Sequence, residues 1–177
     1  LTVGDLMLDL RTRTATRALM RAGASETNAR ATADGLVYAD AQGTASHGVS
    51  RVPQYCGHMK SGRIDGAAAP TIAKSHGATA IVDACDGLAF AAGQFAIAHA
   101  IATAKKQGLA FVAVTNSYHF GAAIYYLEAV AKAGMMGLAF SNSPAAMAAW
   151  GGKRPLFGTN PIAAMFPREG REPLAID

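Results

Sequence analysis

Cysteine is scarce in this chain, which has two cysteines, Cys56 and Cys85, among 177 residues. The two lie far apart, and the residues around them do not show the spacing of a zinc site. A disulfide framework is therefore not indicated, and no metal site is predicted. Few cysteines without a framework favour a reducing, cytoplasmic setting.

Long apolar runs are also missing. The most apolar stretch, residues 89–104, includes Gln94 and His99 and is rich in alanine, so it is too short and too weakly hydrophobic for a membrane span. No cationic and then apolar leader precedes the first expected helix, so a signal peptide is not predicted. We expect no membrane contact.

Two common phosphate-binding signatures are absent. A Rossmann-type Gly-x-Gly-x-x-Gly would follow the first strand of a dinucleotide fold, but after residues 79–84 the chain offers only Cys85-Asp86-Gly87. No Walker sequence occurs either, because Gly152-Lys153 is followed by Arg154. If a dinucleotide binds here, it does so by another scheme.

Positive charge exceeds negative charge only slightly. The chain has 16 Lys and Arg against 12 Asp and Glu, a formal net charge of +4. Arg13, Arg17 and Arg21 recur every four residues, which places them on one face of a surface helix. A solvated helix face explains this spacing better than a nucleic-acid site, and the excess charge suits anionic cofactors and substrates.

Apolar periodicity divides the chain into a helical part and an alternating part. Helices are predicted at about residues 4–20, between Ser25 as N-cap and Gly43, and at 49–61. Residues 63–78 are expected to be a connection. Beyond it, strands and helices alternate, and the expected elements are strand 79–84, helix 91–106, strand 110–115, helix 121–133, strand 136–141, strand 162–166 and a final strand from residue 173. We predict an α/β protein with a helical subdomain over residues 1–75 and a second domain over 76–177.

The first candidate site is the stretch Ala45-Ser46-His47-Gly48-Val49-Ser50-Arg51. On a helix, His47 and Arg51 would lie one above the other on a single face. An imidazole transfers protons near neutral pH, and a guanidinium holds a carboxylate by two parallel hydrogen bonds. Ser46 is expected to orient the imidazole or the substrate. Two structural alternatives stay open: Ser46 as a helix cap, and Arg51 in an ion pair with Asp40 or Asp65.

The second candidate site is Asn116-Ser117-Tyr118-His119-Phe120-Gly121, between a predicted strand and a predicted helix. The N-terminus of that helix would offer free N–H groups to a phosphate. His119 is a candidate proton carrier or hydrogen-bond donor to a cofactor, and the alternative is a histidine that only caps the helix. Three other histidines have no comparable polar company and are expected to be structural or exposed: His58, His76 and His99.

The third candidate site is the Gly-, Pro- and Asn-rich stretch 141–161. It contains Trp150-Gly151-Gly152-Lys153 and Gly158-Thr159-Asn160-Pro161. Glycines permit close backbone approach, and Lys153, Thr159 and Asn160 offer hydrogen-bond donors. A long loop without regular structure more often has a function than not, although a purely structural loop stays open.

Together these motifs resemble one family. Residues 40–51, DAQGTASHGVSR, are similar to its "aD-x-x-G-x-x-SHG-x-x-R" segment, and residues 116–123, NSYHFGAA, to its "NSxHFGxA" loop. WGGK at 150–153 with GTNP at 158–161 resembles its "WGG…GTNP" loop, although Ala148-Ala149 replaces the usual proline. The family is the malate/L-lactate dehydrogenase group, which is unrelated to the Rossmann-type enzymes and includes ureidoglycolate, sulfolactate and diketogulonate dehydrogenases and a cyclic-imine reductase.

The resemblance implies an NAD- or NADP-dependent oxidoreductase that interconverts 2-hydroxy and 2-oxo acids. It implies a mixed-sheet, non-Rossmann nicotinamide-binding domain and a homodimer with its active site between the subunits. By motif, His47 would donate a proton to the substrate carbonyl oxygen, Ser46 would belong to its relay, and Arg51 would bind the substrate carboxylate. The expected cofactor contacts are His119, Phe120, Gly121, Ala122, Ala123 and Thr159.

Several alternatives stay open after this comparison. In some members the histidine that matches His119 is the acid/base, so the proton carrier is either His47 or His119. Family chains continue past Asp177, and the resemblance places the relay aspartate and part of the nicotinamide site downstream of it. The residues do not distinguish malate, lactate and sulfolactate, or NAD and NADP. A chain that is complete at residue 177 would instead suggest a non-catalytic anion-binding or interaction module.

Overall fold

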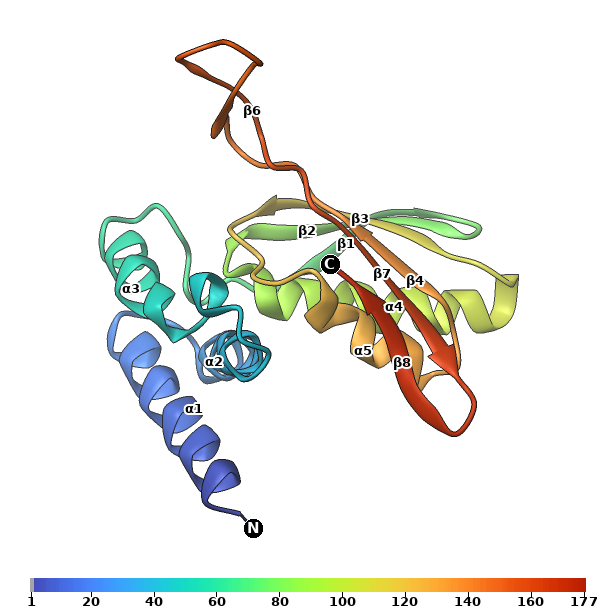
Figure 1. Cartoon of the computed structure of the whole chain (residues 1–177), viewed down its shortest axis with the longest axis horizontal. Helices are drawn as coiled ribbons and strands as arrows, with labels where there is room; N and C mark the ends of the chain where they lie inside the picture. The colour runs from blue at the N-terminus through green and yellow to red at the C-terminus, as the bar shows by residue number, and fades with distance from the viewer. Residues whose placement is uncertain (1) are drawn as a thin grey trace.

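The computed structural model describes residues 2–177, and its first part is helical (Figure 1). Helix α1 begins with a reciprocal cap, in which Thr2 and Asp5 each bind the other's backbone N–H. Ser25 caps α2 by accepting the N–H of Asn28 at 3.2 Å, as the sequence predicted. The helical elements are α1 (Val3–Arg21), α2 (Glu26–Ala41), the 3₁₀ turns η1 (Ala45–His47) and η2 (Val49–Arg51), and α3 (Val52–Lys60).

The second part is a mixed arrangement of helices and strands. Strands β1 (Thr71–His76), β2 (Thr79–Gly87) and β3 (Phe111–Ser117) form one sheet, in which β1 is antiparallel and β3 parallel to β2. Strands β4 (Gly137–Phe140), β7 (Ile162–Arg168) and β8 (Arg171–Ile176) form an antiparallel sheet in the order β4-β7-β8. A two-stranded ribbon pairs β5 (Met147–Ala148) with β6 (Pro155–Phe157).

Two helices join these sheets to the helical part. Helix α4 (Ala89–Gln107) connects the parallel strands β2 and β3, and α5 (Ile124–Lys132) follows β3 and packs on β7 (Figure 1). The fully buried Phe90 of α4 belongs to the same core cluster as Leu36 of α2 and Tyr55 of α3. Because one core includes side chains from both parts, the helices of the first part pack on α4 and α5 of the second.

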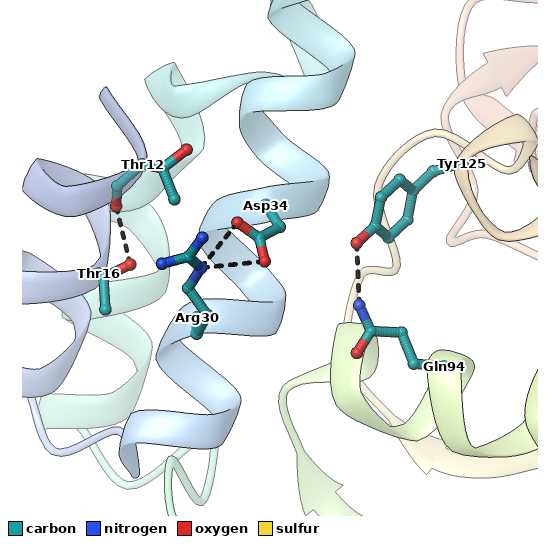
Figure 2. Close-up of polar contacts among 6 residues, drawn as sticks. All are labelled: Thr12, Thr16, Arg30, Asp34, Gln94 and Tyr125. Atoms are coloured by element: carbon teal, nitrogen blue, oxygen red, sulfur yellow. Dashed lines mark hydrogen bonds and ion pairs between the residues drawn. The ribbon is translucent and has the colours of Figure 1, made fainter. Parts of the chain in front are cut away.

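Polar contacts around this core occur both within one helix and between helices. Figure 2 shows the ion pair of Arg30 with Asp34, one turn apart on α2, and the bond from Gln94 Nε2 to the hydroxyl of Tyr125 at 2.9 Å. The first is solvent-exposed and contributes little to stability. The second joins α4 to α5.

The structure confirms the α/β class and most predicted elements, and it corrects three of them. The expected connection 63–78 contains strand β1, and β2 runs on through the expected turn at Asp86-Gly87, with positive φ angles at Cys85 and Asp86. The helix expected over residues 49–61 begins with the 3₁₀ turn η2, which continues directly into α3 at Val52, and the extended Gly48 (φ −90°, ψ −160°) separates it from η1. The division of the chain at residues 75 and 76 stays a prediction.

Two kinds of feature are absent from the residues that the structure describes. Over residues 2–177, no helix combines the length and the apolar character that a membrane crossing requires. In the same part of the chain, histidine, cysteine and carboxylate side chains do not gather in threes or more as metal ligands would.

The contact between α2 and α4 yields a test of core packing. A Cβ atom at the buried Gly35 would lie 2.3 Å from Cε1 of Phe90, so we expect Gly35→Ala to lower the free energy of unfolding by about 1–3 kcal/mol through overpacking. At the exposed Gly57 of α3 a Cβ would meet nothing within 4 Å, and we expect Gly57→Ala to raise stability by about 0.5–1 kcal/mol. Urea unfolding of both variants measures the contrast, and equal effects would contradict this packing.

Candidate active site

The turn that carries Ser46 and His47 is shaped by Asp40 at the end of α2. A carboxylate oxygen of Asp40 accepts the N–H of Val49 at 3.2 Å, and Gly48 is packed so closely on the same carboxylate that a Cβ there would overlap it at 1.7 Å. Only glycine fits this position. Gly48 therefore separates the two 3₁₀ turns, so His47 and Arg51 do not belong to one helix, and the expectation that they share a helical face is wrong.

Arg51 nevertheless lies beside Ser46 and His47, because its side chain folds back over the turn. Its Nε donates to the carbonyl oxygen of Ser46 at 2.7 Å, and Nη1 donates to Oε1 of Gln54 at 3.1 Å. Both contacts are with neutral oxygens, and Arg51 is absent from the ion pairs among the described residues. The guanidinium is thus oriented, but its charge is not neutralised.

The ion-pair alternatives for Arg51 are therefore wrong. Asp40 lies 3.8 Å from Nη1 of Arg11 instead, and Asp65 accepts the backbone N–H of Ala67 at 2.8 Å. The cap alternative for Ser46 is wrong too, since η1 has Thr44 as its N-cap and makes no side-chain cap bond.

Two imidazoles stack at the centre of the site. The ring centroids of His47 and His119 lie 5.3 Å apart and the interplanar angle is 28°. The two residues are 72 positions apart in the sequence. Oγ of Ser46 is hydrogen-bonded to Nδ1 of His47 at 2.9 Å. Two of the three predicted stretches are thus brought together, and Ser46 contacts the imidazole as expected.

Behind His119 lies a fully buried tyrosine. The hydroxyl of Tyr55 is 2.6 Å from Nδ1 of His119, and the N–H of Gly121 points to the same nitrogen at 3.4 Å. The alternative that His119 only caps the next helix is wrong, because α5 begins at Ile124 and its first N–H is bound by Asp177 at 3.0 Å.

A second polar chain extends from Arg51 along α3. Gln54, which accepts from Arg51, donates from Nε2 to the hydroxyl of Tyr118 at 3.5 Å, and that hydroxyl is hydrogen-bonded to Nδ1 of His58. The guanidinium of Arg63 lies over the Tyr118 ring, 5.9 Å from its centroid. The sequence interpretation of His58 as lacking polar company is therefore wrong.

The environment lowers the proton affinity of both imidazoles. Burial, and then the charges of Arg51 and His47, lower the pKa of His119 to about 4. Burial and the charge of Arg51 also lower the pKa of His47, while the carboxylate of Asp177 raises it. Burial raises the pKa of the Tyr55 hydroxyl well above its usual value, so Tyr55 stays protonated. At neutral pH the permanent cation of Arg51 therefore lies near a neutral His119.

The loop before α5 presents mainly backbone to its surroundings. Gly121 has a φ of +73° and touches Phe90 so closely that a Cβ would lie 2.7 Å from Cζ. Ala122 and Ala123 are buried, and the ring of Phe120 stacks on that of Tyr126 with 5.4 Å between the ring centroids. The expected free N-terminus of α5 is partly occupied, because the Asp177 carboxylate already takes its first N–H. A phosphate at that end would compete with a carboxylate of the chain itself.

Thr159 is not brought to the histidine pair. Its N–H donates to Oγ of Ser143 at 2.9 Å, and Asn160 accepts the N–H of Ser143 at 3.2 Å, so both ends of the loop 141–161 are tied to each other. The rest of the loop projects from the body of the molecule as an arm, with the ribbon of β5 and β6 at its end (Figure 1). Trp150 on this arm is fully exposed.

Sequence reasoning missed four residues of the site: Gln54, Tyr55, Tyr118 and Asp177. Tyr55 follows Arg51 by four positions, a helical spacing that would have identified it. Tyr118 directly precedes His119 and was quoted only as part of its motif. Asp177 offered no local signal, since its contact is with a helix 53 positions earlier.

The fold and the site together define a class of protein. The fold is a mixed α/β fold without the Rossmann glycine loop, and its site joins stacked imidazoles to an uncompensated guanidinium at the end of a sheet. Such a site suits proton transfer beside a small carboxylate.

Comparison with known proteins gives the family. The malate/L-lactate dehydrogenase family model matches residues 8–177, and the chain belongs to this family. It is 45% identical over 163 residues to a (2R)-3-sulfolactate dehydrogenase (NADP(+)) of Chromohalobacter salexigens, covering 92% of this chain and 49% of that protein. It is 42% identical over 148 residues to the L-sulfolactate dehydrogenase of Methanocaldococcus jannaschii, covering 84% and 43%.

A solved structure supports the same assignment. The malate dehydrogenase from Pyrococcus horikoshii OT3 matches with a TM-score of 0.90 at 33% identity, over 96% of this chain and 48% of that one. The non-Rossmann fold class is thereby confirmed. The chain spans about half the length of the relatives it matches. Because these relatives are dehydrogenases by name, the alternative of a non-catalytic module has no support.

The position of Asp177 yields a test of the site's electrostatics. Its carboxylate raises the pKa of His47, so we expect Asp177→Asn to lower that pKa, because the charge disappears while an oxygen remains for the N–H of Ile124. NMR titration of the His47 Cε1 proton measures the change. Glu172→Gln, which removes an exposed carboxylate from strand β8 just before Asp177, is the matched control and should leave the pKa of His47 unchanged. Equal titration of both variants would contradict the placement of Asp177.

Proposed function

We propose that the protein containing this chain is an NAD- or NADP-dependent oxidoreductase that interconverts a 2-hydroxy acid and a 2-oxo acid of the malate, lactate or sulfolactate type. The observation that carries the proposal is Arg51, an oriented guanidinium without a carboxylate partner, next to the imidazole of His47. The names of the relatives, two sulfolactate dehydrogenases and a malate dehydrogenase, support the same reaction.

Arg51 would bind the substrate carboxylate. Its contacts with Ser46 and Gln54 use Nε and one N–H of Nη1, which leaves Nη2 and the other N–H of Nη1 for a bidentate interaction. Since both existing partners are neutral, a carboxylate would not have to displace a competing anion. The substrate is thereby held with its reacting carbon at a fixed distance from the imidazoles.

His47 would transfer the proton. Nδ1 of His47 is held by Ser46, so Nε2 is the nitrogen left for the substrate oxygen. In the reducing direction His47 donates a proton to the carbonyl oxygen, and in the oxidising direction it accepts the hydroxyl proton. The nearby Asp177 favours the charged imidazole, because its carboxylate raises the pKa of His47. When bound, the nicotinamide supplies or accepts the hydride.

The loop 119–123 fits a nicotinamide by its chemistry. Gly121 has no side chain and those of Ala122 and Ala123 are buried, so the loop lets a ligand approach its backbone closely. The N–H of Gly121 and the carbonyl of Phe120 are bound within the chain, so a carboxamide would have to use the other backbone groups of the loop. We therefore assign His119, Phe120 and this small-residue run to the cofactor side. Thr159 reaches a cofactor only if the arm 141–161 contacts it, and no described contact joins the arm to the histidines.

We also infer that two copies associate through the arm. Trp150 is fully exposed, and Leu156 and Phe157 are 65% and 52% exposed on the same projecting loop. Large apolar side chains gathered at an exposed tip indicate a surface that is covered by a partner. A homodimer whose arm reaches toward the neighbouring site would explain why Thr159 lies away from its own histidine pair.

An assay of the intact protein tests the proposed reaction. Nicotinamide absorbance is followed with NAD and NADP across malate, lactate, sulfolactate and their 2-oxo acids, and turnover of at least one pair is expected. In that assay Arg51→Lys should raise KM roughly 10- to 100-fold, because a point charge replaces a bidentate fork. Arg21→Lys on α1 is the matched control and should not change KM. No turnover on the panel, or an unchanged KM in Arg51→Lys, would contradict the proposal.

Replacement of the proton donor separates the two histidines. We expect His47→Ala to lower kcat by about 10²–10⁴-fold, the usual contribution of general acid–base catalysis. Because substrate binding depends on Arg51, KM should change much less than kcat. Turnover close to that of the unmodified protein would show that another group, His119 first, moves the proton.

A further inference from the structure

The contact between Tyr55 and His119 has no role in the reaction as described so far. Tyr55 is 0% exposed, and its hydroxyl lies 2.6 Å from Nδ1 of His119. The ring is fixed by its neighbours, since it stands edge-on to Tyr118 at 5.6 Å and is tilted against Phe90 at 6.5 Å. A rigid, buried hydroxyl aimed at one imidazole nitrogen constrains the protonation of that ring.

The backbone of Gly121 decides which way the hydrogen bond runs. Its N–H points to the same Nδ1 at 3.4 Å, and a backbone N–H can only donate. Nδ1 must therefore be an acceptor, which means that it carries no proton. The hydroxyl of Tyr55 then donates to Nδ1 as well, which leaves the proton of the neutral imidazole on Nε2. Because the Gly121 contact is long at 3.4 Å and the Tyr55 bond is short at 2.6 Å, the hydroxyl is the stronger of the two donors that hold this tautomer.

We propose that Tyr55 is a positioning residue that holds His119 as the Nε2–H tautomer, so that this imidazole acts as a fixed hydrogen-bond donor and not as the proton carrier. The inference rests on the proposed function only for what His119 donates to. In a 2-oxo acid reductase, the acceptor is an oxygen in the site, either the substrate carbonyl or the nicotinamide carboxamide.

The charges around His119 act in the same direction. Arg51 and the stacked His47 both disfavour a positive charge on His119, and with burial they lower its pKa to about 4. The carboxylate of Asp177 raises the pKa of His47, not that of His119. The two imidazoles are thus differentiated by their partners: a hydroxyl and a carboxylate for His47, and a tyrosine and a backbone N–H for His119.

Nitrogen-15 NMR of the histidine rings tests the tautomer directly. In the ligand-free intact protein, long-range proton–nitrogen correlations distinguish a protonated from an unprotonated ring nitrogen, and His119→Asn assigns the signals. We expect an unprotonated Nδ1 and a protonated Nε2 at His119, unchanged between about pH 5 and pH 8. An Nδ1–H tautomer, or titration of His119 within that range, would overturn the proposal.

A tyrosine pair tests the role of the hydroxyl. Tyr55→Phe keeps the buried ring but removes the donor, so we expect a mixture of His119 tautomers and a roughly tenfold lower kcat/KM, the value of one hydrogen bond. The matched control is Tyr125→Phe, which removes the hydroxyl that accepts from Gln94 (Figure 2) and should leave the His119 signals unchanged.

The outcomes separate this inference from the proposed function. An unchanged tautomer in Tyr55→Phe would overturn the role of Tyr55. The nitrogen-15 spectrum of the unmodified protein decides the His119 tautomer even if the variant does not fold. If the tautomer is as expected and no hydroxy acid is turned over, the proposed function fails and the assignment of His119 stands.

Discussion

The fully buried ring of Tyr55 joins the two halves of the site. It lies in the core cluster that α1, α2 and α3 share with Phe90 of α4, so its position depends on how these helices pack on α4. Its hydroxyl lies 2.6 Å from Nδ1 of His119, so the packing of the core fixes the position of a polar contact in the site. His119, which stacks on His47, is thereby tied to the packing of the helices.

Glycine has a similar influence where polar groups come close to the backbone. Gly48 lets the Asp40 carboxylate approach the turn and cap it, and Gly121 lets the loop pass over Phe90 with a positive φ. A side chain at Gly48 would displace the turn that carries His47, and one at Gly121 would displace the loop that carries His119. The SHG and HFG sequences are thus explained by packing as much as by chemistry.

Local patterns predicted the elements that carry strong periodicity or a cap, and they missed those that do not. Helix α4 and strand β3 were predicted to within a few residues, and Ser25 was correctly assigned as the cap of α2. Strand β1 was missed because every residue of it is exposed, so no alternation of polar and apolar side chains marks it as a strand. Its hydrogen bonds to β2, which no local pattern encodes, are what make it an edge strand.

The site shows the same limit. Ser46, His47 and Arg51 were recognised because they are close in sequence, and His47 and Arg51 do converge, although by two 3₁₀ turns and not by a helix. Tyr55 and His119 meet across 64 positions, and only the tertiary structure brings them together. The neutral partners of Arg51 could not be predicted either, since its side chain turns back on the backbone of Ser46.

The uncompensated charge of Arg51 links substrate binding to proton transfer in the proposed reaction. In the free site burial, and then this charge, lower the pKa of His47, which works against loading the proton donor. A bound carboxylate neutralises the guanidinium and adds a negative charge beside the imidazole, and both effects raise the pKa of His47. Asp177 adds to this increase, whereas His119 has its Nδ1 already bound by Tyr55. In the proposed reaction, binding of the substrate carboxylate thus favours the protonated form of His47 that would donate to it.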